Sequence, residues 1–553
     1  MTPLKRFYNL LTLDKKDVYQ IIFYAAFAGL ISLTLPLGIQ AIINFIQGGQ
    51  VSISWIILII MVTLGVALSG LLSLMQLRIT ENLQQKIFIR SSFEFAMRLP
   101  NISFKELYNN YPPELANRFF DTLNIQKGTS KLLLDFSTAL LQMGLGVILL
   151  SLYHPFFIIF GVLLFILLYA IFKFSFQEGL DTSLKESKYK YKAAYWLQEI
   201  ARNTNSFRKA RNFDYALGKN DHLVGDYVGF REKHFSIIKR QYTQLILFKV
   251  LITAGLLSVG GYLVLSQQMN IGQFVAAEII ILLVINSVEK IIIGLETLYD
   301  VLTSVEKIGQ ISDMELEKAN LQPKKINADK GIVLEAEDIT FRYPDADKDA
   351  LKKISLKIQP GEKVFISGKN GSGKSTLVRL LSGYIPPASG AFFINENNFS
   401  KTDKNEYQIH TGVVMQGETP FEGTLLQNIT FDDPTITDES LKWAIESVGL
   451  SAYIKKLPLG LDTQIYPDGR QLTSSITRRI MLARAIVTKP KVLFLEDPTD
   501  GMDDEKARKI IDFLFAPEHS WTVVVSSVNN YWKERCNRQV EMEKGEIIND
   551  IKL

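Results

Sequence analysis

The stretch LEDPTDGMD, residues 495–503, places two adjacent carboxylates, Glu496 and Asp497, after four apolar residues and before a proline. A short apolar run of this kind predicts a buried strand. Acids at the end of such a strand can hold a metal ion beside a phosphate, and a carboxylate there can act as a general base toward water. The pair therefore raises the question of nucleotide hydrolysis, which requires a phosphate-binding loop elsewhere in the chain.

That loop is present in GKNGSGKST, residues 368–376, between the strand-like EKVFISG and the helical LVRLLSG. The pattern G-x-x-x-x-G-K-[ST] in this setting wraps phosphates with backbone N–H groups, and the following helix N-terminus adds positive dipole. Lys374 is expected to reach the β- and γ-phosphates of the nucleotide, and Ser375 to coordinate Mg²⁺. The predicted nucleotide contacts are Gly368, Asn370, Gly371, Ser372, Gly373, Lys374, Ser375 and Thr376.

An aromatic residue, Tyr343 in FRYPD, lies upstream of the loop. Its ring can stack on adenine, although a strand tyrosine taken alone is more often a packing residue. We therefore predict Tyr343 as a nucleotide contact and keep the packing role open.

The composition sets further limits. The 553 residues are 47% apolar and 21% charged, so part of the chain can lie in lipid and part cannot. A net charge of +4 is too small to indicate a nucleic-acid partner. The single cysteine, Cys536, excludes an intrachain disulfide and a Cys-rich metal site, and fits a reducing compartment.

Apolar runs are concentrated before residue 300 and predict six membrane-spanning helices, because about 20 apolar residues cross a bilayer. The alternative, buried helices of a large soluble protein, does not explain the alternating charge of the loops. The expected spans are roughly 19–45, 54–76, 133–153, 155–175, 245–266 and 273–297.

Three connecting loops, 46–53, 154–155 and 266–272, contain no Lys or Arg, whereas the other segments are basic. Positive charge is retained on the cytoplasmic side of a membrane. Both termini are therefore expected to be cytoplasmic and the outer loops very short. The sequence predicts a multi-pass protein of the lipid bilayer.

The two inner segments are long and polar, which predicts that the spanning helices continue into the cytoplasm. Each is expected to contain a short reversal that touches another domain, at 104–119 and at 195–208.

The composition changes after Asp300. Residues 306–331 are charged and are predicted to be a linker, so the membrane domain is predicted at 1–305. From 332 to 553 apolar strands alternate with helical stretches, which is typical of an α/β domain with a largely parallel sheet. The predicted fold is an all-α six-helix transmembrane domain followed by an α/β P-loop NTPase domain.

Landmarks beyond the phosphate loop carry a resemblance to a known family: VVMQGETPFEGTLLQNI around Gln416, GRQLTSSITRRIMLARAIVTKPKVLFLEDPT, and TVVVSS ending at Ser527. The second half resembles the nucleotide-binding domain of ABC transporters, and the six spans resemble an exporter half-transporter. The resemblance covers nearly the whole chain. It implies ATP and Mg²⁺ as cofactors, with Gln416 sensing Mg²⁺ and contacting the membrane domain. It also implies a dimer, with a second copy or a related half-transporter, in which each ATP lies between one phosphate loop and the partner's signature motif.

The signature motif departs from the family pattern. The family reads LSGGQ, whereas here the motif is LTSSI, in which Thr473 keeps a hydroxyl while Ser474 and Ser475 replace two glycines. Glycine permits close approach of a backbone to phosphate, so the two Cβ atoms are expected to hold the partner's γ-phosphate further off. The simpler alternative is that these residues only cap a helix.

The two acids stand in inverted order, because the family has aspartate and then glutamate before Pro-Thr. The resemblance implies the metal-side role for Glu496 and the place of the general base for Asp497. Aspartate is one methylene shorter, and a base must come within about 2.6–3.2 Å of the water it activates. A misplacement of about 1 Å can cost roughly 100-fold in rate.

The family's switch histidine, which meets the γ-phosphate, is replaced by Ser527. The loss of a positioned donor can cost about 10²–10³ in rate. Nucleotide is therefore expected to bind, and hydrolysis to be slow or absent. The predicted catalytic residues are Asp497, Glu496, Ser527 and Gln416, the predicted Mg²⁺ ligands are Ser375, Gln416 and Glu496, and Thr473, Ser474 and Ser475 are further predicted nucleotide contacts.

Ionisable residues inside predicted spans indicate a transport pathway. Glu278 is the best candidate for lining a cavity. Lys249, Glu289 and Lys290 lie near the cytoplasmic membrane edge or pair structurally in the alternative interpretation.

The cargo is suggested only by FAMRLPNISFKEL, which loosely resembles the first cytoplasmic loop of type I secretion and bacteriocin exporters. A secreted peptide or protein, a periplasmic adaptor protein and a bacterial inner membrane are the corresponding expectations, and lipid or drug export stays open. The short segment before the first span is expected to leave no room for an N-terminal peptidase domain.

Three functions remain in competition at this point. The first is a slow ATP-driven exporter working as a homodimer. The second is a regulatory or gating membrane protein that binds ATP without pumping. The third is the degenerate half of a heterodimeric transporter.

Overall fold

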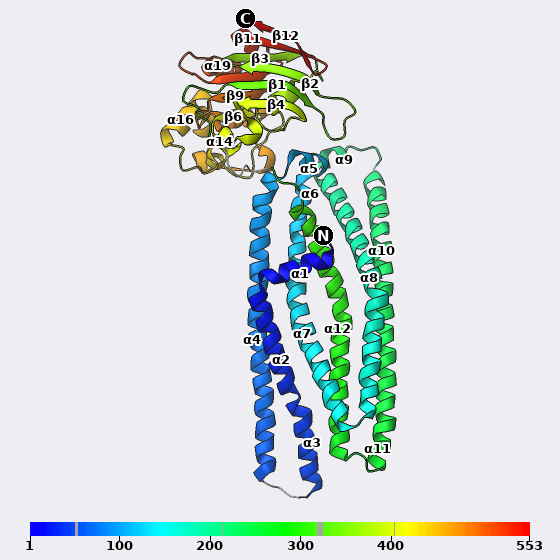
Figure 1. Ribbon diagram of the computed structural model, residues 1–553. Helices are drawn as coiled ribbons and strands as arrows, with labels where there is room; N and C mark the ends of the chain where they lie inside the picture. Colours follow the sequence, from blue (N-terminus) through cyan, green and yellow to red (C-terminus); the bar gives the residue numbers. More distant parts are fainter. Residues whose placement is uncertain (50–52, 213, 318–324, 403) are drawn as a thin grey trace. The chain divides into compact units, whose positions relative to one another are not determined.

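The computed structural model describes residues 1–49, 53–212, 214–317, 325–402 and 404–553. The described chain divides into two compact units: Met1–Ile102 with Asn110–Glu315, and Ser103–Asn109 with Leu316–Leu553. Figure 1 shows long helices in the first unit and strands with short helices in the second. The predicted loop 46–53 and the predicted linker 306–331 lie partly outside the described residues.

Six segments of the first unit are long and apolar enough to cross a membrane. Each overlaps one of the predicted spans, so the predicted six-helix membrane domain is confirmed. The segments have 33 to 52 residues, well beyond the roughly 20 that a bilayer requires. The six are Lys15–Gln47, Ile53–Asn101, Pro112–Tyr153, Phe156–Arg202, Asp214–Leu265 and Ile271–Ser312.

The helices of this unit are α1 (Pro3–Leu13), α2 (Lys15–Ser32), α3 (Thr34–Gln47), α4 (Ile53–Arg98), α6 (Pro112–Asn117), α7 (Asp121–Tyr153), α8 (Phe156–Arg202), α9 (Thr204–Arg208), α10 (Asp214–Gly255), α11 (Gly261–Leu265) and α12 (Ile271–Ser312). Short 3₁₀ turns, η1 (Leu99–Asn101) and η2 (Arg118–Phe120), and a π-helical turn, η3 (Leu256–Gly260), complete the unit.

The first predicted span is interrupted where α2 passes into α3. The Leu33 N–H donates to Leu30 O at 3.2 Å, which tightens the last turn of α2. Pro36 has no N–H to donate to the Ser32 carbonyl, and its ring crowds that carbonyl. The proline therefore accounts for a break that the apolar run alone did not predict.

Glycines allow α7 and α12 to pack closely. A Cβ built on Gly146 would lie 2.6 Å from Val284 Cγ2, and one on Gly294 would overlap the Phe136 ring. Small residues at helix contacts are the usual means of close approach inside a membrane. These two helices consequently meet at a distance that larger residues would not permit.

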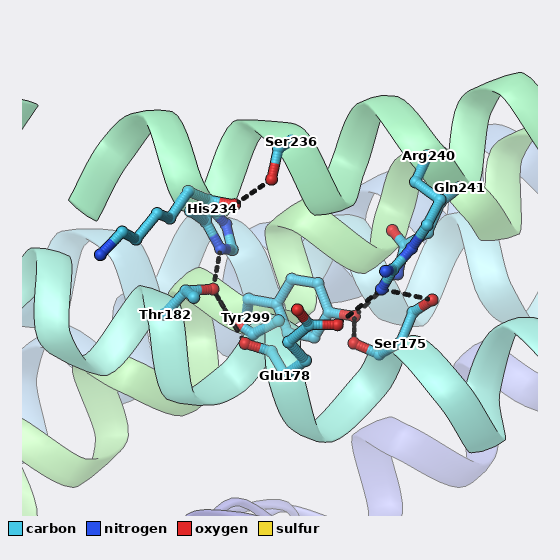
Figure 2. A network of polar contacts seen from close by, with 10 residues as sticks. Ser175, Glu178, Thr182, His234, Ser236, Arg240, Gln241 and Tyr299 are labelled. Atoms are coloured by element: carbon cyan, nitrogen blue, oxygen red, sulfur yellow. Dashed lines mark hydrogen bonds and ion pairs between the residues drawn. The ribbon is translucent and has the colours of Figure 1, made fainter. Parts of the chain in front are cut away.

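A polar network joins α8, α10 and α12, as Figure 2 shows. The fully buried His234 shares a 2.9 Å hydrogen bond between its Nδ1 and Thr182 Oγ1. Gln241 donates from Nε2 to the Tyr299 hydroxyl at 3.1 Å. Gly179 lies against the same tyrosine ring, and a Cβ built there would overlap it. The network fixes three long helices by hydrogen bonds and by one close ring contact.

The described strands of the second unit form two larger sheets and the two-stranded antiparallel pair β7–β8. A four-stranded antiparallel sheet has the order β2-β1-β4-β5, and a six-stranded sheet has the order β12-β11-β3-β10-β9-β6. In the larger sheet only the β11–β12 pair is antiparallel. The strands are β1 (Leu334–Phe341), β2 (Leu351–Ile358), β3 (Lys363–Gly368), β4 (Ser389–Ile394), β5 (Asn397–Asn398), β6 (Thr411–Val414), β7 (Gly423–Thr424), β8 (Gln464–Ile465), β9 (Val492–Glu496), β10 (Thr522–Ser526), β11 (Arg538–Glu543) and β12 (Glu546–Lys552).

The larger sheet is apolar on both faces, because alternate residues of its central strands enter different cores. In β9, for example, Phe494 packs in the core that contains α13, and Leu493 and Leu495 pack in the core that contains α18 and α19. Burial on both faces is characteristic of a parallel sheet covered by helices, so the predicted α/β domain is confirmed. The helices are α5 (Phe104–Asn109), α13 (Lys374–Leu381), α14 (Lys404–Ile409), α15 (Leu425–Thr430), α16 (Asp438–Ser447), α17 (Ser451–Ile454), α18 (Ser474–Ile486), α19 (Asp504–Leu514) and α20 (Asn530–Arg535), with the 3₁₀ turns η4 (Phe399–Lys401), η5 (Gly460–Asp462) and η6 (Pro467–Gly469).

Candidate nucleotide-binding site

The phosphate loop connects β3 to α13, as the sequence pattern predicts. Gly373, at φ 103°, caps α13, and a Cβ there would lie 2.7 Å from Ala350 O. Gly368 has φ 143°, and a Cβ built on it would overlap the backbone carbonyl oxygen of Met542. Only glycine fits these two positions, since both combine positive φ with close backbone contact. Lys374 Nζ donates to Gly368 O at 2.8 Å and to Lys369 O at 3.0 Å, so the ammonium lies directly over the loop.

Glu496 lies at the carboxyl end of β9 and is 3% exposed. Its Oε2 accepts a hydrogen bond from the Gln416 N–H at 3.2 Å and lies 3.8 Å from Arg379 Nη2. The structure thus brings the predicted metal-side acid and the predicted glutamine-loop residue together. Glu496 ends β9 and Gln416 follows β6, its parallel neighbour, and the carboxyl edge of a parallel sheet is where such folds bind ligands.

Asp497, predicted as the general base, is held by the loop after β10. The residue has φ 42°, which is unusual for a non-glycine residue. Its backbone N–H donates to Ser526 O, and its Oδ1 accepts from the Val528 N–H, both at 2.9 Å. One carboxylate oxygen is therefore engaged in fixing the backbone of that loop.

Ser527, which the sequence predicts at the switch-histidine position, makes a hydrogen bond within the same loop. Its hydroxyl accepts a hydrogen bond from the Asn529 N–H at 3.2 Å. The short serine side chain thereby stabilises its own turn.

The predicted signature residues begin α18. Thr473 is the N-cap, and its side-chain hydroxyl accepts a hydrogen bond from the Ile476 N–H at 3.4 Å. The helix-capping role that the sequence offered as the simpler alternative is therefore present. Ser474 is the first residue of the helix and lies against Gly501, where a Cβ would be 2.6 Å from Ser474 Oγ. The serine side chain therefore occupies space beside the segment that follows β9.

Tyr343 follows β1 and is partly buried. Its hydroxyl lies 3.2 Å from Thr376 Oγ1 on α13, and its ring makes a T-shaped contact with Phe341 at 5.0 Å between centroids. The ring thus borders the phosphate loop, and it also packs, so both roles left open by the sequence are compatible with its position.

Two charged residues near Glu496 were missed by sequence reasoning. Arg379 was detectable, since it lies four positions after Ser375 and thus on the same face of α13. Glu418, two positions after Gln416, has its pKa raised by burial, an effect that Arg484 and Arg478 partly oppose. No local pattern marked Glu418.

The predicted pathway residues on α12 meet α7 and α10. Glu289 Oε2 forms a 2.5 Å ion pair with Lys249, which is the structural pairing considered as the alternative. Glu289 and Lys290 also line a cavity of about 480 Å³, whereas the half-buried Glu278 does not. The other residues around this cavity are Lys131, Asp135, Gln142, Leu283, Asn286, Ser287, Ile293 and Gly294.

Two family models match the chain in the expected order. The ABC transporter transmembrane region matches residues 18–205, and the ABC transporter domain matches residues 351–500.

Curated relatives include the leukotoxin translocation ATP-binding protein LktB of Mannheimia haemolytica and of Bibersteinia trehalosi, and the exotoxin translocation ATP-binding protein PaxB of Pasteurella aerogenes. Each is 29% identical over 332 residues, which is 59% of this chain and 46% of the relative. The match thus spans about half the length of these relatives.

Among solved structures, a bacterial Atm1-family ABC exporter with ATP bound is similar in fold. The TM-score is 0.86 at 16% identity, with 97% of this chain and 96% of that chain covered. By its two family domains and their order, the chain belongs to the ABC transporters, as a half-transporter with a six-helix membrane domain followed by an α/β nucleotide-binding domain.

Proposed function

We propose that this half-transporter is an ATP-driven exporter with slow hydrolysis. ATP is held between the phosphate loop of one subunit and the signature motif of its partner, and closure of the two nucleotide-binding domains drives the membrane helices between inward- and outward-open states. The partner is a second copy of this chain, and a related half-transporter is the alternative.

One observation carries the proposal: the groups for binding are positioned, whereas the groups for cleavage are partly engaged in local hydrogen bonds. Lys374 lies over the phosphate loop, and Glu496 lies beside Gln416. In contrast, Asp497 holds the Val528 N–H, and the Ser527 hydroxyl holds the Asn529 N–H. This pattern supports firm ATP binding combined with slow turnover.

The residues suited to Mg²⁺ are Ser375, Gln416 and Glu496. A hydroxyl, an amide oxygen and a carboxylate are the hard oxygen donors that this ion takes. The Glu496 carboxylate is buried and faces cationic or N–H groups, which fits a site that handles positive charge. When bound, Mg²⁺ would neutralise charge on the phosphates.

The cargo is proposed to be a secreted peptide or protein. The similarity to leukotoxin and exotoxin translocation proteins supports this choice, as does the charged lining of the cavity between α7 and α12. A bacterial inner membrane, cytoplasmic termini and a periplasmic adaptor protein belong to the same proposal. Export of a lipid or a drug is the alternative.

The decisive experiment is the ATPase rate of the purified protein in lipid, with Lys374→Ala as the blank. A rate above the blank that depends on Mg²⁺ is expected. A wild-type rate equal to the blank would exclude an ATP-driven pump.

The regulatory alternative predicts ATP-dependent dimer closure without turnover. It is favoured by the hydrogen bonds that Asp497 and Ser527 accept from neighbouring backbone N–H groups. The heterodimer alternative is tested by native mass spectrometry of the complex from its own host, where two chain types instead of one would establish it.

A further inference from the structure

A short segment between the second and third long helices belongs to the nucleotide-binding unit. Residues Ser103–Asn109, which contain α5, form one compact unit with Leu316–Leu553. In chain order this helix lies between α4 and α6. The sequence predicted a reversal at 104–119 that touches another domain, but not which part of that domain it meets.

The contact is made by aromatic rings at the end of β1. Tyr108 lies against Tyr343 with 5.5 Å between centroids and 31° between planes. Phe104 lies 6.2 Å from Tyr343 and 6.1 Å from Phe341. Four rings, two from α5 and two from the strand end, thus form one cluster.

Tyr343 is fixed at both ends by this arrangement. Its hydroxyl lies 3.2 Å from Oγ1 of Thr376, the last residue of the phosphate-loop motif. Its ring meets Phe341, which is 4% exposed, and Tyr108, which is 45% exposed. The orientation of the ring therefore depends on α5 as well as on the nucleotide-binding domain.

We propose that Tyr108 is a positioning residue for adenine, which holds the Tyr343 ring from behind so that the base can stack on it. The inference rests on the proposed function, in which Tyr343 contacts ATP. Offset aromatic pairs are favourable, and coupling between two binding events is reciprocal. Tyr108 therefore strengthens base binding, and bound adenine in turn strengthens the docking of α5 on Tyr343.

Binding of adenine should therefore stabilise the position of α5, the segment between the second and third long helices. The phosphates are expected at the loop, which Tyr343 meets through its hydroxyl, whereas Tyr108 meets the ring of Tyr343. Tyr108 should therefore affect ligands that carry a base and leave ligands that consist of phosphates alone unaffected.

The test measures binding of ATP and of inorganic tripolyphosphate to the full-length protein in detergent with Mg²⁺. Tyr108→Ala is expected to weaken ATP binding about 3- to 10-fold, the range for loss of an aromatic pair, and to leave tripolyphosphate binding unchanged. Tyr108→Phe keeps the ring and should bind ATP as the wild type does. In a Tyr343→Ala background, Tyr108→Ala should cause no further loss.

Tyr111→Ala is the matched control. This tyrosine lies three positions further along the same connection, and its ring contacts Tyr195 at 6.1 Å. It should not change ATP affinity.

Unchanged or tighter ATP binding by Tyr108→Ala would overturn the inference, as would an equal loss of tripolyphosphate binding, which would indicate a general structural defect. A wild type that binds neither ligand would instead overturn the proposed function itself.

Discussion

The Asp497 carboxylate accepts a 2.9 Å hydrogen bond from the backbone N–H of Val528, the residue that follows the switch position. The bond joins the end of β9 to the loop after β10. Asp497, which the sequence predicts in the place of the general base, therefore also has a structural role. One oxygen is used in this way, which leaves the other for any contact with water.

The two tasks of Asp497 can be separated by substitution. Asparagine keeps an oxygen that accepts the Val528 N–H, but it cannot accept a proton. Asp497→Asn should therefore unfold at the wild-type temperature, whereas Asp497→Ala should lose about 1–3 kcal/mol by leaving that N–H unpaired. Thermal unfolding in detergent measures this difference. Equal destabilisation by both variants would show that the hydrogen bond is not what matters.

The same two variants report on catalysis. Residual ATPase activity should fall to the Lys374→Ala level in both, because neither can act as a base. Wild-type turnover in Asp497→Asn would exclude Asp497 from the chemistry.

Restoring the family's residues should raise hydrolysis. The double variant Asp497→Glu, Ser527→His returns the longer acid and the donor toward the γ-phosphate, and a gain of about 10- to 100-fold is expected. Steady-state phosphate release provides the measurement. The gain should vanish when Lys374→Ala is added, and the absence of any gain would mean that other positions limit the rate.

Packing between α8 and α12 depends on Gly179, since a Cβ there would overlap the Tyr299 ring. Gly179→Ala should destabilise the membrane unit by about 1–3 kcal/mol, the usual cost of overpacking. Gly225→Ala on α10 is the matched control, because nothing lies within 4 Å of a Cβ at that position. The control should unfold at the same temperature as the wild type or a higher one, given the helix propensity of alanine. A drop in Gly225→Ala as large as that in Gly179→Ala would contradict the packing argument.

His519 should make the nucleotide-binding domain acid-sensitive. Its ring stacks on Trp521 at 4.3 Å and meets Phe513 at 4.7 Å, and burial lowers its pKa. Glu518 raises this pKa and Lys363 lowers it, both more weakly than burial. The unfolded chain binds the proton more readily, so this contribution to stability is complete above about pH 6.5 and is lost as the pH falls toward the lowered pKa.

The measurement is the unfolding temperature, followed by tryptophan fluorescence at pH 7.5 and at pH 5.5. His519→Gln should show a smaller acid-induced drop than the wild type. His410→Gln, at the residue before β6, should show the wild-type drop. An undiminished drop in His519→Gln would assign the acid sensitivity to other groups.

Much of the fold was predictable because its signals are local. Apolar runs near 20 residues mark spans whatever their neighbours are, and the six predicted spans each overlap a long helix. The break at Leu33 was not predicted, although Pro36 carries the necessary information. The phosphate loop was predictable for a similar reason, since its conformation depends on glycines only a few positions apart.

The sequence by itself determined the order of the two domains and the phosphate loop, and it predicts the departures at Ser474, Asp497 and Ser527, because each of these is a residue type at a position set by its immediate neighbours. Only the tertiary structure decided that Asp497 holds Val528, that Arg379 faces Glu496 and that Tyr108 lies on Tyr343. These contacts join residues on different elements. They depend on how strands and helices pack, and they produce no periodic pattern in the sequence from which they could be predicted.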